Sequence, residues 1–233
     1  LKLMNGGVED YKELEWSRKV NSSITGQTAG YNSVLSDRAV IGEGCYLEDS
    51  FVHSRAVVGK GVILSYLDVH DEVIPDDVVL HGLKQKNGKF VCRIYGVEDN
   101  PKESVLFGMD LAKRAGELGI REDELWGTGE HTLWQAELYP ECDGIQAAVK
   151  ASLNLYEIFH NGGDLASWRK ENRKSLCSGF HDADASAIIA WNKRMQELVQ
   201  MDEIAKDIRQ GKPVREVTDL EPLTKIQREW MEK

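Results

Sequence analysis

The chain has 233 residues, of which 41% are hydrophobic and 29% are charged, a composition typical of a folded globular protein with one large domain or two small ones. Its formal net charge of −10, from 29 basic and 39 acidic residues, is unfavourable for binding a phosphate backbone, so we expect no nucleic-acid partner. No apolar run approaches the roughly 18 residues that span a membrane, and the four cysteines lie far apart without a C-x-x-C pair; we therefore expect no membrane partner and a cytoplasmic, reducing location.

Six-residue units recur in the first third of the chain, and each unit opens with an aliphatic residue. They cover residues 35–39, 41–45 and 47–51 and, after a slip of one residue, 52–56, 58–62 and 64–68. In a parallel β-helix such units place one side chain each in the core, and glycine or aspartate turns the corners. The pattern predicts about two coils of a short left-handed parallel β-helix, with a pair of ordinary short strands as the alternative.

A β-hairpin is predicted to follow and to cover the open end of the coils. Residues 78–84 and 89–95 flank Lys86-Asn87-Gly88, in which Asn-Gly supplies the positive φ angles of a tight turn. Upstream, residues 20–25 could add a strand and Asn5-Gly6-Gly7 suggests a loop. Because the chain starts with Leu1 rather than Met, we expect it to be either a segment of a longer polypeptide or a processed chain.

Helical periodicity begins after Pro101. Residues 106–118 and 145–159 carry the apolar spacing of amphipathic helices, and Asn161-Gly162-Gly163 ends the second of these helices. Asp164 is predicted to cap a further helix, and Asp182 or Asp184 to cap the longest one. That helix carries an apolar stripe, which consists of Ile188, Trp191, Met195 and Leu198. A last turn and helix are predicted to end near Gly211 and Pro213. The fold class is therefore mixed β and α, with a β-helix and capping hairpin at 1–100 and a helical domain at 101–233.

The sequence contains no glycine-rich phosphate loop and no cluster of metal ligands at a recognisable spacing, so we assign no catalytic residue and no metal site. His53 and His70 lie in or just after the coils. An imidazole there could act as the general base of a self-contained hexapeptide-type acyltransferase, which is one alternative function. His81 has the same kind of position.

The string from Ser175 to Asp184 is rich in hydrogen-bonding groups and follows a basic run. We therefore regard Arg173, Ser178, His181 and Asp182 as candidates for binding a sugar phosphate or a nucleotide. The alternative interpretation is a capped connection, in which Ser178 or Asp182 accepts hydrogen bonds from the first N–H groups of the next helix.

Three strings together resemble the L-fucokinase / GDP-L-fucose pyrophosphorylase family, especially its bifunctional bacterial members. They are Asp123-Glu124-Leu125-Trp126, the nine residues from Thr132 to Pro140, and residues 175–184 with the helix that follows. The resemblance implies an enzyme of fucose salvage that makes GDP-L-fucose from L-fucose 1-phosphate and GTP. It also implies a nucleotidyltransferase domain, then a left-handed β-helix and helical region, then a kinase domain. This chain resembles the middle region.

Two positions depart from the family pattern: Gln135 and His181 stand where asparagine is expected. No catalytic residue can be carried over, so the resemblance implies a non-catalytic structural or assembly segment. It implies no cofactor in this chain and Mg²⁺ for the full enzyme. Its expected partners are the nucleotidyltransferase and kinase domains of the same polypeptide, a second copy through the β-helix, and, for the full enzyme, GTP and L-fucose 1-phosphate.

Overall fold

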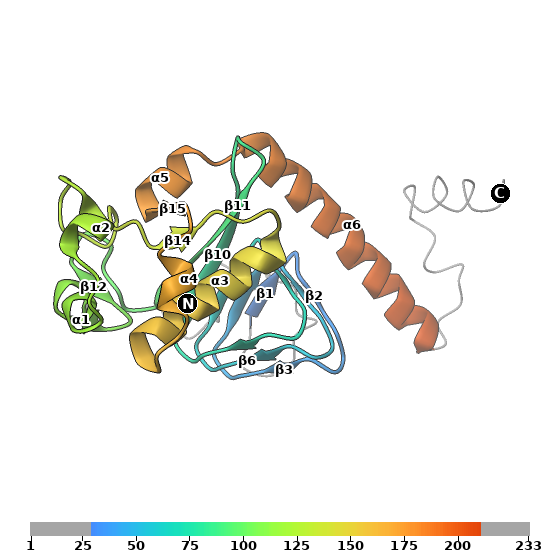
Figure 1. Cartoon of the computed structure of the whole chain (residues 1–233). Helices are drawn as coiled ribbons and strands as arrows, with labels where there is room; N and C mark the ends of the chain where they lie inside the picture. Colours follow the sequence, from blue (N-terminus) through green and yellow to red (C-terminus); the bar gives the residue numbers. More distant parts are fainter. Residues whose placement is uncertain (1–28, 211–233) are drawn as a thin grey trace, which may run out of the picture.

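The computed structural model describes residues 29–210. A β-solenoid of about three coils at residues 30–81 is followed by a β-hairpin and then by helices, of which the last is the longest (Figure 1). The strand and loop predicted upstream, and the turn and helix predicted near Gly211 and Pro213, lie outside the described residues. Among the described residues, no helix is long and apolar enough to cross a membrane.

Three parallel sheets form the walls of the solenoid. The first contains β1 (Ala29–Tyr31), β4 (Tyr46–Glu48), β7 (Ile63–Ser65) and β10 (Val78–Lys84); the second, β2 (Val34–Leu35), β5 (Phe51–Val52) and β8 (Asp68–Val69); the third, β3 (Val40–Ile41), β6 (Val57–Val58) and β9 (Val73–Ile74). The predicted parallel β-helix is confirmed, but the predicted number of coils, about two, is too low.

The length of the coil repeat explains why the third coil was not predicted. Val34, Phe51 and Asp68 are successive partners in the second sheet, 17 residues apart, as the hexad pattern with its one-residue slip requires. In the third sheet the last step, from Val57 to Val73, is one residue shorter. The shorter step breaks the sequence template at the third coil, although that coil contributes buried aliphatic residues to the core like the other two.

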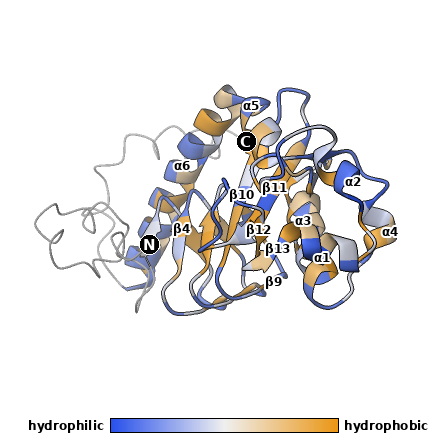
Figure 2. Cartoon of the chain, turned by 90° about the vertical axis from the view of Figure 1, so that its left-hand side faces the viewer, coloured by the Kyte–Doolittle hydropathy of each residue, from blue (hydrophilic) through white to orange (hydrophobic). Residues whose placement is uncertain are grey.

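The core of the solenoid is a stack of aliphatic side chains. Leu47, Leu64 and Leu80 occupy equivalent positions on successive coils and are fully buried. Burial of one such side chain is worth about 1.5–3 kcal/mol. In Figure 2 the solenoid strands are mostly hydrophobic and the connecting loops mostly hydrophilic, in agreement with a filled interior.

Close contact between coils at one corner requires glycine. A Cβ atom on Gly59 would lie 2.8 Å from the carbonyl carbon of Pro75 and 2.7 Å from the amide nitrogen of Asp76 on the next coil. Gly42 meets Gly59 in the same way one coil earlier, at 2.5 Å from its carbonyl oxygen. This corner therefore sets the spacing of all three coils.

The predicted hairpin is confirmed. β10 pairs antiparallel with β11 (Phe90–Gly96) over its whole length, and Gly88 in the turn has a φ of +84°. Residues Val79, Leu80 and His81 of β10 also pair in parallel with β7. β10 thus belongs both to the third coil and to the hairpin that covers it.

The helical part begins with a tight turn instead of the predicted helix at 106–118. β12 (Val105–Leu106) and β13 (Met109–Asp110) pair around Phe107 and Gly108, which have φ angles of +53° and +72°. A right-handed helix cannot include these conformations. Helix α1 (Leu111–Glu117) therefore starts later, where the Asp110 carboxylate accepts a hydrogen bond from the Lys113 amide.

The remaining elements are α2 (Glu122–Trp126), β14 (Tyr139–Pro140), α3 (Ile145–His160), α4 (Leu165–Trp168), β15 (Arg173–Lys174), α5 (Leu176–His181) and α6 (Ala185–Arg209). The predicted helix at 145–159 and the Asp164 cap are confirmed by α3 and α4. Of the two capping residues considered for the longest helix, Asp184 is the N-cap of α6.

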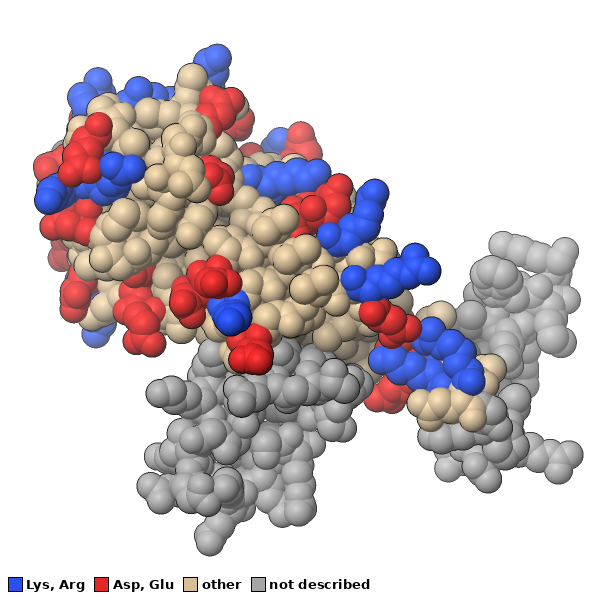
Figure 3. Space-filling model, turned by 90° about the horizontal axis from the view of Figure 1, so that it is seen from below, with Lys and Arg blue, Asp and Glu red and all other residues tan. Residues whose placement is uncertain are grey.

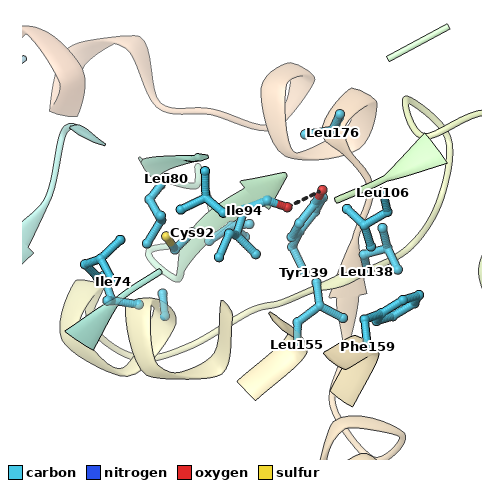
Figure 4. Packing of buried hydrophobic residues seen from close by; sticks show 14 of the residues in the cluster. Ile74, Leu80, Cys92, Ile94, Leu106, Leu138, Tyr139, Leu155, Phe159 and Leu176 are labelled. Atoms are coloured by element: carbon cyan, nitrogen blue, oxygen red, sulfur yellow. Dashed lines mark hydrogen bonds between the residues drawn. The ribbon is translucent and has the colours of Figure 1, made fainter. Parts of the chain in front are cut away.

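A continuous cluster of buried side chains joins the solenoid to the helical part. Helix α3 packs across β10 and β11, and the Tyr139 hydroxyl donates to the Ile94 carbonyl at 3.1 Å between buried aliphatic residues (Figure 4). The Trp168 indole donates to the Leu138 carbonyl at 2.9 Å. These two hydrogen bonds offset the cost of burying the polar groups of Tyr139 and Trp168. The division at residue 100 stays a prediction.

Helix α6 lies along the outside of the solenoid and extends beyond it (Figure 1). It is attached through Asp49, which is almost completely buried. The Asp49 carboxylate accepts from the side-chain amides of Asn32 and Asn192, the latter at 2.9 Å, and its carbonyl accepts from the Trp191 indole at 2.6 Å. Further along α6, Met201 and Ile208 are exposed.

Candidate functional site

The predicted ligand residue Arg173 is used by the fold. Its guanidinium lies 4.0 Å from the centre of the Trp168 ring and donates to the carbonyls of Glu137, Glu124 and Trp168 at 3.0, 3.1 and 3.2 Å. The planar guanidinium group can donate to several carbonyls and stack on a ring at the same time, which an ammonium group cannot do as well. The side chain thereby connects α2, α4 and the segment before β14.

Ser178, His181 and Asp182 lie together at α5, apart from the partners of Arg173. Ser178 belongs to a capping box with Ser175, the N-cap of α5: the Ser175 amide donates to the Ser178 hydroxyl at 2.9 Å. His181 is exposed at the end of the helix. The Asp182 carboxylate accepts from the Lys174 ammonium at 2.7 Å, and this hydrogen bond lowers the pKa of Asp182 and raises that of Lys174.

The four predicted residues therefore do not form one cluster. Neighbouring residues of β15 direct Arg173 toward Trp168 and Lys174 toward Asp182, because successive side chains of a strand point to opposite faces. Their role in binding a ligand stays a prediction.

A groove lies between α6 and the hairpin. It has a volume of about 300 Å³, and its lining is mostly apolar, with the charged side chains of Lys84 and Arg194 at its border. Trp191 and Ile188 of the predicted stripe line it, whereas none of the four predicted ligand residues does.

His53, Asp68 and His70 form a polar cluster on the second sheet of the solenoid. His53 follows β5, and Asp68 opens the next strand, β8, which His70 follows. The Asp68 Oδ1 atom lies 2.7 Å from His53 Nε2 and 3.2 Å from His70 Nε2. The two imidazole rings stack with their centres 3.8 Å apart. One ligand atom from each residue lies within 4.8 Å of the others, so this group could hold a metal ion.

Gln146 of the helical part and Glu72 of the solenoid border this cluster. The Gln146 amide, in the first turn of α3, lies 2.8 Å from His70 Nε2 and 3.3 Å from Asp68 Oδ2. Glu72, whose side chain is buried, accepts from the amides of His70 and Asp71 at 2.7 and 3.1 Å. The turn that carries His70 is therefore held in place.

This cluster is not among the predicted sites, although the sequence carries a signal for it. His53 and His70 are one coil apart, so a 17-residue period places them side by side. The hexad pattern predicts the two histidines only as separate candidate bases. With two coils as the predicted extent of the solenoid, Asp68 and His70 lie at its end.

His81 has a different environment. It lies beside the buried Arg93 guanidinium, and burial together with the charge of Arg93 lowers the pKa of His81 to about 3. The imidazole is therefore neutral and accepts a hydrogen bond from Arg93, which also donates to the Leu176 carbonyl at 3.3 Å. This pair connects the hairpin to α5.

The third sheet presents a row of exposed valines, which we call the valine ladder. Val40, Val57 and Val73 are direct partners across β3, β6 and β9, and their exposed fractions are 59%, 38% and 67%. Figure 3 views the molecule from the side of β3 and β6, where uncharged side chains form a broad area with Asp and Glu at its border. A row of solvent-exposed apolar side chains is typical of an interaction surface.

Comparison with known proteins gives one match. The family model of the fucose pyrophosphorylase domain matches residues 1–144, more than half of the chain. No curated protein and no solved structure matches. The matched region contains the valine ladder and the histidine cluster, whereas the predicted ligand residues at 173–182 lie beyond it. The chain belongs to the fucose pyrophosphorylase family, which is linked to GDP-fucose synthesis.

Proposed function

We propose that this chain is a non-catalytic structural segment of an enzyme that makes GDP-L-fucose from L-fucose 1-phosphate and GTP. The valine ladder carries the proposal, as the surface on which the catalytic nucleotidyltransferase domain of the same polypeptide docks. Mg²⁺ is a cofactor of the full enzyme in this proposal, and a kinase domain is a further part of the polypeptide. We do not propose acyl transfer through His53 or His70, because the family match indicates a different chemistry.

The size of the ladder favours a tethered domain over a second, separate copy as the partner. Covering the exposed parts of the three valines is worth about 2–5 kcal/mol, at about 1.5–3 kcal/mol for each fully buried valine. Micromolar association needs about 8 kcal/mol, so the ladder alone is too weak to hold a free partner. A domain in the same polypeptide has a millimolar effective concentration, at which about 4 kcal/mol gives half occupancy, so the upper part of this range is enough to dock such a domain.

The docking is tested by thiol labelling in the full-length enzyme and in the isolated chain. Val73→Cys introduces a thiol on the ladder, and Lys60→Cys places the control thiol at another exposed position of the solenoid. We expect Val73→Cys to react roughly two- to fivefold more slowly in the full-length enzyme, as a docking free energy of about 4–5 kcal/mol gives at a millimolar effective concentration. Lys60→Cys should react equally in both proteins. The native cysteines are subtracted with the unsubstituted proteins. Equal labelling of Val73→Cys in both proteins would contradict the proposal.

The non-catalytic role is tested separately. The isolated chain is mixed with GTP, L-fucose 1-phosphate and Mg²⁺, and GDP-L-fucose is measured by chromatography. We expect no product, and product formation with the full-length enzyme as the positive control. Turnover by the isolated chain that survives further purification would show that the segment is itself catalytic.

A further inference from the structure

We propose that His53, Asp68 and His70 bind a divalent transition-metal ion of the Zn²⁺ type, and that this ion ties the second and third coils of the solenoid together. The inference is independent of the proposed docking function. It depends on the geometry of the cluster and on the chemistry of its three ligand atoms.

The distances fit an ion with small adjustments. Ligand atoms about 2.0–2.1 Å from Zn²⁺ in a tetrahedral arrangement lie about 3.3 Å from each other. In the structure, Asp68 Oδ1 is 2.7 Å from His53 Nε2 and 3.2 Å from His70 Nε2, and no pair of the three atoms is farther apart than 4.8 Å. An ion between them requires side-chain rotations, because the two imidazole rings are stacked in the structure.

The ligand types select the class of metal. Two imidazole nitrogens and one carboxylate oxygen suit Zn²⁺ and its neighbours, whereas Mg²⁺ and Ca²⁺ prefer oxygen ligands throughout and Cu⁺ prefers sulfur. Three protein ligands leave one position of a tetrahedron open. Gln146 contacts His70 and Asp68 through its amide nitrogen; with the amide turned over, its oxygen can occupy this position, and a water molecule is the alternative ligand.

The fold brings the three ligand residues together before an ion arrives. Strand pairing places Asp68 opposite Phe51 and stacks the two histidine rings. The buried Glu72 carboxylate fixes the turn after β8 through the amides of His70 and Asp71. Supporting contacts of this kind are what metal sites use to orient their ligands. The side chains of His53, Asp68 and His70 are 31%, 23% and 38% exposed, so an ion can reach them from solvent.

The test is a titration of the tag-free, chelator-treated chain with Zn²⁺ by calorimetry. We expect one site per chain with micromolar or tighter affinity. Asp68→Asn and His70→Gln keep the size of the side chain and should weaken binding at least about tenfold. His131→Gln, an exposed histidine on another part of the molecule, is the matched control and should bind as the unsubstituted chain does.

Two further measurements separate a specific site from loose surface binding. Co²⁺ in the same site should give the visible absorption of a tetrahedral ion, and Asp68→Asn should abolish it. Zn²⁺ should raise Tm of the unsubstituted chain but not of Asp68→Asn, whose metal-free circular dichroism verifies that it folds. Millimolar affinity, or binding that both site variants leave unchanged, would overturn the proposal.

Discussion

Replacing Gly59 with alanine tests whether the close corner of the solenoid sets the coil spacing. The new Cβ atom would lie 2.7 and 2.8 Å from main-chain atoms of Asp76 and Pro75, which can move only if the third coil moves. The same shift would weaken the hydrogen bond from the Lys60 amide to the Asp76 carboxylate, now 2.8 Å. Overpacking costs about 1–3 kcal/mol and the lost hydrogen bond about 1 kcal/mol, so we expect a loss of about 2–4 kcal/mol.

The assay is urea unfolding followed by circular dichroism, supported by thermal melts. At ~2–4 °C per kcal/mol for a protein of this size, Tm should fall by roughly 4–16 °C. Gly116→Ala is the control, because Gly116 lies exposed in α1 with open space around it, and alanine there should stabilise the helix by about 0.5–1 kcal/mol. The two identical substitutions should therefore change the stability in opposite directions. A Gly59→Ala variant as stable as the unsubstituted chain would refute the argument from coil spacing.

Three further predictions concern contacts between the solenoid, the hairpin and the helices. Because the pKa of His81 is lowered from 6.5 to about 3, the unfolded chain binds a proton that the folded chain refuses between these pH values. Stability should therefore fall with decreasing pH by up to about 1.4 kcal/mol per unit, and His81→Gln, measured in the same urea titrations, should lose this slope. Arg173→Lys should cost about 2–4 kcal/mol, because lysine cannot serve three carbonyls and stack on Trp168; unchanged stability in thermal melts would contradict the structural role. Asp49→Ala should cost about 2–4 kcal/mol by removing the buried carboxylate that accepts from Asn32 and Asn192, although Asn32 keeps its hydrogen bond to the Asn192 carbonyl. Limited proteolysis should then cut α6 faster than the rest of the chain.

The solenoid and the main helices could be predicted from sequence because they depend on local periodicity. The recurrence of Ile41 at Val58, and of Leu47 at Leu64, carries the coil repeat. The third coil escaped prediction because its step is one residue shorter and because Leu80 also belongs to the hairpin. The predicted start of the helix at residue 106 was wrong because Phe107 has a positive φ. A positive φ is not expected from a phenylalanine in the sequence.

The candidate sites depend on contacts that the sequence does not display. Asn192 reaches Asp49 across 143 positions, and the carbonyls bound by Arg173 belong to three separate segments. Arg173 looked like a ligand residue because an arginine in a polar, basic string has the same appearance whether it binds a phosphate or main-chain carbonyls. The histidine cluster could have been found, since the coil repeat alone aligns His53 with His70.

The double pairing of β10 also limits how the solenoid can change its length. Because this strand closes the third coil and then turns into an antiparallel hairpin, no further coil can be added after it without losing the hairpin. A duplicated unit of 17 residues between the first and second coils would instead keep every pairing register. Members of the family with more coils should therefore have gained them on the N-terminal side of β10, while the hairpin and the helices packed on it stay the same.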